Sequence, residues 1–298
     1  METAREIQTR MKSIKDTMKI TNAMYMISSA KLKKARKNLE NTEPYFHMLQ
    51  GTIARIVRHL PEMEHPYFET EQKTKNPEKK RGYLVVSADK GLAGAYNHNV
   101  LKLTEEYLKQ GKDNTLFLVG ELGREYFLQR KIPIQRDFHY GVQNPDLAKA
   151  REIADRLVRL YNEKKLDEIY VIYTYCVNSM KMEAEVQKLL PLKKEVFATS
   201  MIYGVYKEDI RMIPSGEVVL NNVIPDYVTG FIYGALVESF CSEQNSRMMA
   251  MKAATDNGDK ILKDLQLQFN RVRQGAITQE ITEVVAGAKA QKNRRRKK

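Results

Sequence analysis

The chain has 298 residues, a length that allows two domains of ordinary size. It is 42% hydrophobic and 29% charged, contains no Trp and has a formal net charge of +13 at pH 7. Its two cysteines lack C-x-x-C spacing, so no metal or redox motif is indicated. The uncharged apolar run at residues 227–237 is about half of a membrane-spanning helix, and the charged first turns argue against a secretory signal.

Positive charge is concentrated at both ends of the chain. Residues 1–60 contain twelve Lys and Arg against five Asp and Glu, and residues 289–298 contain seven cations and no anion. Basic surfaces bind nucleic acid, anionic lipid or an acidic protein face. A nucleic-acid-binding coiled-coil protein is therefore one alternative, although neither a recognition module nor an aromatic stacking pattern is present.

The N-terminal segment predicts a long helix with one apolar seam. No strong helix breaker precedes Pro44, and we expect the helix to start near Glu2 and to continue past Pro44 to about His59. Alternating steps of four and three residues select mostly apolar or aromatic positions, the 3.5-residue repeat of a helix that wraps around a partner. These positions are Ile7, Met11, Ile14, Met18, Thr21, Tyr25, Ser28, Leu32, Ala35 and Leu39.

The C-terminal segment carries a second seam with the same period. Residues 225–290 contain no proline after Pro225 and predict one continuous helix. Two such seams predict an antiparallel two-helix coiled coil within the chain, the alternative being that each is an ordinary core-facing helix stripe. The second seam comprises Val237, Cys241, Gln244, Met248, Met251, Thr255, Gly258, Leu262, Leu265, Phe269, Val272 and Ala276.

An α/β domain is predicted between the two seams. Apolar runs of strand length alternate with helical patterns, which predicts a parallel, Rossmann-like sheet. The strand runs are residues 83–88, 116–120 and 168–175, and the helical patterns are residues 99–110 and 146–162. Residues 69–82 are polar and predict an exposed loop, whereas residues 196–220 predict strands and turns around Pro214-Ser215-Gly216.

The predicted fold class is therefore α/β with long helices. The expected parts are an N-terminal coiled-coil helix (1–60), a linker (61–82), the α/β domain (83–220), a C-terminal coiled-coil helix (221–290) and a basic tail (291–298).

The sequence predicts no catalytic residue, cofactor or metal site. A glycine-containing turn at residues 89–95 follows the first strand, where dinucleotide folds place their phosphate loop. Its spacing is G-x-x-G, which differs from both phosphate-loop motifs, and a tight turn needs glycine for backbone reasons alone. The five histidines are scattered. A nucleotide-dependent enzyme remains the second alternative.

Several stretches carry specific motifs. Residues 6–24 read EIQTRMKSIKDTMKITNAM, and residues 242–257 read SEQNSRMMAMKAATDN. Residues 28–32, 86–94 and 270–283 add SSAKL, VSADKGLAG and NRVRQGAITQEITE. Together these stretches resemble the gamma subunit of F-type rotary ATP synthases of the bacterial type, at both ends and in the middle of the chain.

The resemblance implies a rotor shaft without catalytic residues or cofactors. In this family the coiled coil penetrates a ring of three alpha and three beta subunits, and the α/β domain is a foot that sits with epsilon on the c-subunit ring. Proton flow turns the ring and the shaft, and ATP forms on beta. We therefore expect a peripheral protein at the cytoplasmic face of the cell membrane, with membrane contact only through partner subunits and no nucleic acid partner.

The motif match also implies contact residues. It places Lys19, Met24 and Lys31 near an acidic segment of beta, and Arg273, Gln274 and Thr278 beside a beta loop higher up the shaft. The tip residues Ile277, Ile281, Val284 and Val285 are shifted by one residue from the seam. We expect them to face outward as a bearing, because apolar contact is non-directional and lets a shaft turn.

Two features depart from the family. Its tyrosine-rich segment before the last helix has no convincing match in residues 218–226, so no c-ring contact is assigned. Family chains commonly end near Gly287-Ala288, whereas this chain continues into the basic tail. The sequence does not identify the coupling ion.

Overall fold

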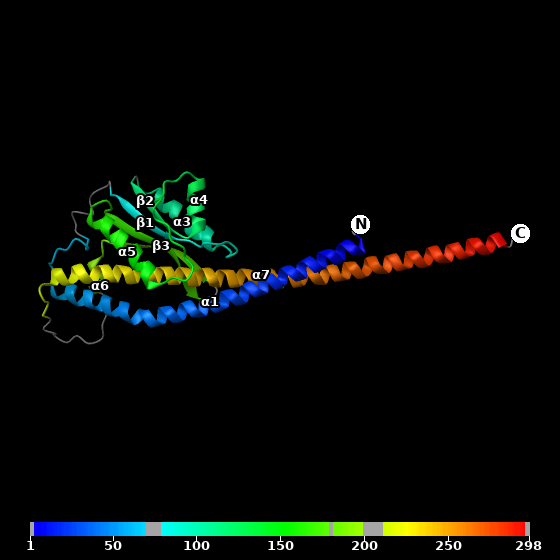
Figure 1. Cartoon of the computed structure of the whole chain (residues 1–298), viewed down its shortest axis with the longest axis horizontal. Helices are drawn as coiled ribbons and strands as arrows, with labels where there is room; N and C mark the ends of the chain where they lie inside the picture. Colours follow the sequence, from blue (N-terminus) through cyan, green and yellow to red (C-terminus); the bar gives the residue numbers. More distant parts are fainter. Residues whose placement is uncertain (1–2, 70–78, 112, 179–180, 199–210, 296–298) are drawn as a thin grey trace. The chain divides into compact units, whose positions relative to one another are not determined.

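The structure is a computed structural model that describes residues 3–69, 79–111, 113–178, 181–198 and 211–295 (Figure 1). The chain divides into two compact units. One consists of Met1–Ile27 with Met248–Lys298, and we call it the helix-pair unit; the other, Ser28–Arg247, is the sheet unit. The helices α1 (Ala4–His59) and α7 (Gly216–Arg295) contribute to both units.

The sheet unit is built on four strands in the order β2-β1-β3-β4. The parallel strands are β1 (Arg81–Val86), β2 (Asn114–Val119) and β3 (Glu168–Asn178), as the apolar runs predict. The edge strand β4 (Lys181–Leu190) is antiparallel to β3 and was not predicted. Its sequence alternates polar and apolar residues, because an edge strand is only half covered.

Helices cover both faces of this sheet (Figure 1). Alternate strand residues point to opposite faces. Leu84 and Val171 face a core that includes α5 (Leu147–Asn162) and the sheet-unit parts of α1 and α7. Tyr83 and Ile172 face a second core with α3 (Tyr96–Leu108) and the unpredicted α4 (Glu121–Gln129). The Rossmann-like layering predicted from the sequence is confirmed.

The prediction of strands and turns over residues 196–220 is wrong where the chain is described. The helix α6 spans Lys194–Ala198, and α7 begins at Gly216, so Pro225 lies inside α7 instead of starting it. The backbone N–H of Val218 donates to Ser215 Oγ at 3.3 Å. Serine is favoured before the first helical turn because it accepts such a hydrogen bond, so the Pro-Ser-Gly signal marks a helix start. Residues 199–210 lie outside the described residues.

The boundaries of the parts also differ from those predicted. Residues 291–295, assigned to a basic tail, continue α7, and residues 296–298 lie outside the described residues. Within the predicted linker, Tyr67 and Phe68 are buried in the core, whereas residues 70–78 lie outside the described residues. The sheet unit is longer than residues 83–220 because α1 and α7 bury apolar faces against the sheet layer.

Candidate functional site: the helix pair and the unpaired end of α7

The first turn of α1 is capped by residues of its own sequence. Thr3 Oγ1 accepts the backbone N–H of Glu6 at 3.3 Å, and the Glu6 carboxylate accepts the backbone N–H of Thr3 at 2.8 Å. This reciprocal pair is a capping box, which satisfies donors that a helix start leaves unpaired. The helix therefore begins sharply at Ala4, two residues later than predicted.

The two seams meet in the helix-pair unit. Thr21 Oγ1 lies 2.8 Å from Thr255 Oγ1, and a Cβ added to Gly258 would lie 2.7 Å from Cγ of Met18. Nearer the start of α1, Met11 lines the same groove as Phe269. Since residue numbers fall along α1 as they rise along α7, the helices are antiparallel. The predicted coiled coil is confirmed, and glycine at position 258 permits the close approach.

The pairing ends well before α7 does. Continuing the register brings Ala4, the first residue of α1, level with Val272. From residue 273 to residue 289 every described side chain of α7 is exposed, including the predicted seam residue Ala276. The tip residues face outward because α1 does not extend alongside them, and not because their repeat leaves a seam that is still paired. Their role as a bearing stays a prediction.

The tip residues nevertheless form one exposed apolar stripe. Ile277, Ile281, Val284 and Val285 are 47%, 59%, 71% and 47% exposed. Their spacing of four, three and one places them on one helix face. Exposed contiguous apolar surface of this kind marks an interaction site.

The predicted contact residues near the start of the chain lie in different surroundings. Lys19 is highly exposed and pairs with Asp16 at 2.9 Å, which lowers the pKa of the Asp16 carboxyl. Met24 is half-buried in the helix-pair unit. Lys31 belongs to the sheet unit, where its Nζ donates to Gln143 Oε1 at 3.4 Å. The structure thus groups Lys19 with Met24, and Lys31 stands in the other unit.

A basic groove also lies on the helix pair. It has a volume of about 550 Å³, with Met11 and Phe269 offering apolar surface and Arg5, Lys12 and Lys15 offering positive charge. Its charge fits an acidic segment with apolar side chains.

The second predicted contact group lies on the unpaired end of α7. Arg273, Gln274 and Thr278 are all exposed. The Thr278 hydroxyl donates to the backbone carbonyl of Gln274 at 2.8 Å. Because that donor is occupied, Thr278 is available to a partner mainly as an acceptor.

Sequence reasoning missed an apolar stripe beside Met24. Ile20 is 62% exposed and Ile27 is 56% exposed, and with Met24 they follow the spacing i, i+4, i+7. These residues could have been recognised from the sequence because they lie outside the 3.5-residue seam. An apolar helix residue that does not face α7 is available to contact another surface.

The glycine turn of the sheet unit is held by α7. Arg247 Nη2 donates to the backbone carbonyls of Lys90 and Gly91 at 3.2 and 3.1 Å, and Arg247 pairs with Glu243 at 2.6 Å. All of this lies within the sheet unit. A phosphate loop presents backbone N–H groups to its ligand. In this turn the guanidinium of Arg247 instead donates hydrogen bonds to backbone carbonyls, so the turn serves to pack the sheet unit against α7.

The isolated chain is therefore expected to bind nucleotides no tighter than millimolar. The G-x-x-G spacing of the turn differs from that of phosphate-binding loops. In addition, Arg247 binds the carbonyls of the turn, so the turn does not have the form of a loop that binds phosphate. Calorimetric titration of ATP, and separately of NAD, into the purified chain measures this. Micromolar binding of either nucleotide would contradict the expectation.

The described residues contain no group of three or more His, Cys, Asp and Glu side chains placed to hold a metal ion. Across the same ranges, no helix combines the length and apolar character needed to cross a membrane.

Comparison with known proteins relates the whole chain to one family. Residues 3–291 match the family described as ATP synthase. The ATP synthase gamma chain of Acetivibrio thermocellus is 46% identical over 293 residues, covering 96% of this chain and 98% of that one. The gamma chain of Acetobacterium woodii, described as sodium ion specific, is 36% identical and covers 97% and 99% of the two chains.

Solved structures share the fold. A chain of the Euglena gracilis mitochondrial ATP synthase, from a structure of OSCP, F1 and c-ring, superposes with a TM-score of 0.64 at 15% identity and covers 96% of this chain and 94% of that one. A chain of the Tetrahymena thermophila central stalk and c-ring gives 0.56 at 22% identity, covering 79% and 99%. The chain belongs to the family of ATP synthase gamma chains.

Proposed function

We propose that the helix-pair unit is the shaft that turns inside a ring of three alpha and three beta subunits and transmits rotation to the catalytic beta sites. The sheet unit is the foot, which stands with epsilon on the c-subunit ring at the cytoplasmic face of the cell membrane. Contact with the membrane then runs through partner subunits, and proton flow through the ring supplies the torque.

The observation that carries this proposal is the end of α7, which continues without a partner helix and exposes four apolar side chains on one face. These four side chains carry no hydrogen-bonding group that would hold one orientation. Apolar contact has no directional requirement, so an apolar sleeve around Ile277, Ile281, Val284 and Val285 would support the shaft at every angle.

The contacts with beta are proposed at two levels. At the first level, an acidic segment of beta contacts Lys19, Met24 and Lys31. The basic groove and the exposed stripe of Ile20 and Ile27 support this assignment. The second level is the group of Arg273, Gln274 and Thr278 on the exposed end of α7.

The shaft assignment is tested by the composition of the native complex. A rotor shaft should be present once beside three alpha and three beta subunits, because only one helix pair can occupy the axis of such a ring. Native mass spectrometry of the complex purified through a tag on this chain measures the stoichiometry. Three copies of the chain per complex would contradict a shaft.

Replacing Arg273 and Gln274 together by Ala is expected to slow coupled ATP turnover and ion pumping by about tenfold without changing assembly. A hydrogen bond to a charged group contributes about 1.5–3 kcal/mol, and each 1.4 kcal/mol shifts a population about tenfold. That energy suffices to favour one rotor angle, whereas the buried seam holds the shaft together. ATP synthesis and proton uptake in reconstituted vesicles measure the effect.

The matched control is Arg151→Ala with Gln129→Ala, which removes the same chemical groups from exposed positions of the sheet unit. It should leave turnover, pumping and melting temperature close to those of the unmodified complex. If the Arg273 and Gln274 variant also pumps normally, or if its complex fails to assemble, these residues are not an angular contact.

A further inference from the structure

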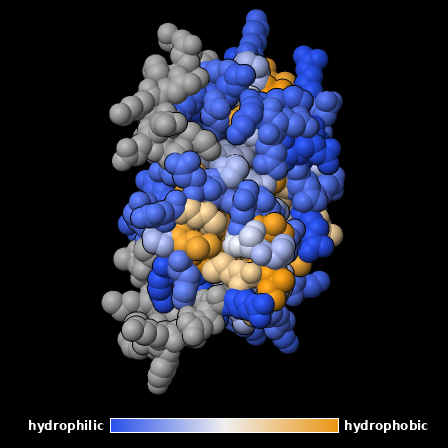
Figure 2. Space-filling model, turned by 90° about the vertical axis from the view of Figure 1, so that its left-hand side faces the viewer, coloured by the Kyte–Doolittle hydropathy of each residue, from blue (hydrophilic) through white to orange (hydrophobic). Residues whose placement is uncertain are grey.

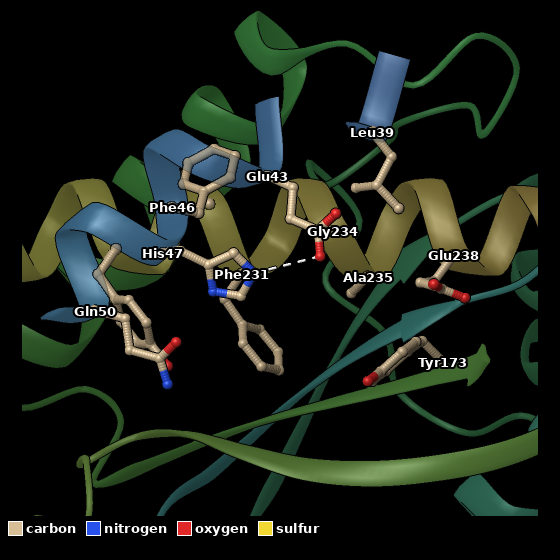
Figure 3. Close-up of a pocket in the computed structure, with 12 residues that line it drawn as sticks. Leu39, Glu43, Phe46, His47, Gln50, Tyr173, Phe231, Gly234, Ala235 and Glu238 are labelled. Carbon is tan, nitrogen blue, oxygen red and sulfur yellow. Dashed lines mark hydrogen bonds and ion pairs between the residues drawn. The ribbon is translucent and has the colours of Figure 1, made fainter. Parts of the chain in front are cut away.

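A cavity of about 460 Å³ lies in the sheet unit where α1, α7 and β3 meet (Figure 3). Leu39, Glu43 and Gln50 line it from α1, and Tyr173 lines it from β3. Its volume falls in the range of small-molecule sites, which is about 300–1,000 Å³. None of these residues belongs to the surfaces assigned to beta contact or to the bearing.

Four aromatic rings border the cavity: those of Phe46, Tyr173, Tyr227 and Phe231. Phe231 meets Tyr173 edge to face, with ring centroids 6.4 Å apart. Figure 3 shows Phe46 with the α1 ribbon and Phe231 and Tyr173 toward the sheet. In the space-filling view of Figure 2, apolar residues gather in patches among polar ones. Aromatic ring faces carry negative potential and attract cations within about 6 Å.

The titratable side chains that line the cavity include two carboxylates and one histidine, His47. Glu43 and Glu238 contribute carboxylates, and none of the described lining residues is Lys or Arg, although the whole chain is strongly basic. Glu43 Oε1 lies 3.3 Å from His47 Nε2, and Glu238 Oε2 accepts the backbone N–H of Cys176 at 3.4 Å. These long contacts leave both carboxylates able to accept from a stronger partner.

The cavity also has free space at one defined backbone position. A Cβ built on Gly234 meets no atom within 4 Å, whereas one built on Gly230, a turn earlier, would lie 1.9 Å from Phe46 Cδ1. The ring of Phe46 therefore occupies the space beside Gly230, and the open volume of the cavity lies beside Gly234.

We propose that this cavity is a binding site for a small organic cation with an aromatic or branched apolar body. The rings would surround the apolar body and the ammonium group, and Glu43 and Glu238 would supply the opposing charge. This inference goes beyond rotation and does not depend on the partner contacts proposed above.

Benzyltrimethylammonium tests the site. Titrated into the purified full chain at constant ionic strength, it should give saturable calorimetric binding at a single site. Phenylacetate has the same ring and the opposite charge and should bind about tenfold or more weakly, because it faces two carboxylates. Equal binding of the two compounds, or no saturable binding, would overturn the proposal.

Variants locate the binding. Gly234→Leu fills the cavity and should abolish binding, and Glu43→Gln combined with Glu238→Gln should weaken it by about tenfold while keeping side-chain shape. The control Glu106→Gln removes an exposed carboxylate on α3 and should leave the affinity unchanged. If Gly234→Leu does not fold, the carboxylate variant decides, and unchanged binding in it refutes the site.

The assembled complex provides the final arm of the test. The same titration on the intact complex should retain the binding that Glu43→Gln with Glu238→Gln removes. Disappearance of this binding on assembly would mean that another subunit fills the cavity, and the assignment to a small cation would be wrong.

Discussion

Replacing Glu168 by Gln is expected to lower the free energy of unfolding at pH 7 by about 3 kcal/mol. Glu168 is buried at the start of β3, where its carboxylate contacts Lys79 and Lys188 at 2.8 Å each and Arg81 at 3.2 Å. The Tyr170 hydroxyl donates to it at 2.9 Å. Removing one partner of a buried ion cluster leaves the other charges uncompensated, which typically costs about 3–5 kcal/mol. Urea unfolding of the full chain measures the change.

The pH dependence of this difference has a defined direction. Burial opposes ionisation of Glu168, but hydrogen bonds from Lys188 and Lys79 outweigh it and lower its pKa from 4.5 to about 2. A pKa that is lower in the folded state contributes stability above pH 4.5, and this contribution is lost as the pH falls toward 2. The difference between the unmodified chain and Glu168→Gln should therefore shrink across that window. A difference that stays constant would contradict the assigned role.

Glu163→Gln is the control for this experiment. Glu163 pairs with Lys165 at 2.8 Å, but the two side chains are 44% and 66% exposed. Water screens the charges of an exposed pair, so such a pair contributes little to stability. This variant should therefore unfold close to the unmodified chain, and a loss equal to that of Glu168→Gln would show that removal of any carboxylate has this effect.

Replacing Gly230 by Ala is expected to destabilise the sheet unit by about 1–3 kcal/mol, although alanine normally favours a helix. The added methyl group would overlap the ring of Phe46, and overpacking forces shifts of this cost. Phe46 is flanked by Tyr45 and Tyr233, at ring centroid distances of 5.4 and 6.2 Å, which limits its movement. Thermal and urea unfolding measure the loss.

Gly234→Ala makes the same chemical change one turn later in the same helix. Its methyl group would meet no atom within 4 Å, so the higher helix propensity of alanine should raise stability by up to about 1 kcal/mol. The two variants should thus change stability in opposite directions. Equal changes would mean that Phe46 does not pack on Gly230 as described.

The long helices and the parallel strands were predictable from the sequence because their signals are local. The seam of α1 repeats over ten positions, and Ile7, Ser28 and Ala35 are among those that the structure buries. The strands β1, β2 and β3 are continuous apolar runs, as expected where helices cover both faces of a sheet. The edge strand β4 lacks such a run, and the alternation of polar and apolar residues over residues 181–186 is the strand signal that the sequence interpretation missed.

The motifs at both ends of the chain identified the family, but they did not reveal what each candidate residue contacts. Lys19 and Lys31 both look like basic positions on one helix, yet Lys19 is exposed beside Asp16 and Lys31 reaches Gln143 of the sheet unit. Which residue a lysine meets depends on segments distant in the sequence, and no local pattern encodes it.

The sequence by itself therefore determined which segments are helices or strands, which helix faces are apolar and which family the chain resembles, because periodicity and motif are properties of neighbouring residues. Only the tertiary structure decided where α1 stops alongside α7, which leaves the side chains of residues 273–289 of α7 exposed. It also decided that Arg247 holds the glycine turn and that a cavity opens beside Gly234. These features arise from the register and packing of segments far apart in the chain, since the geometry of their contact is set by all the partners together.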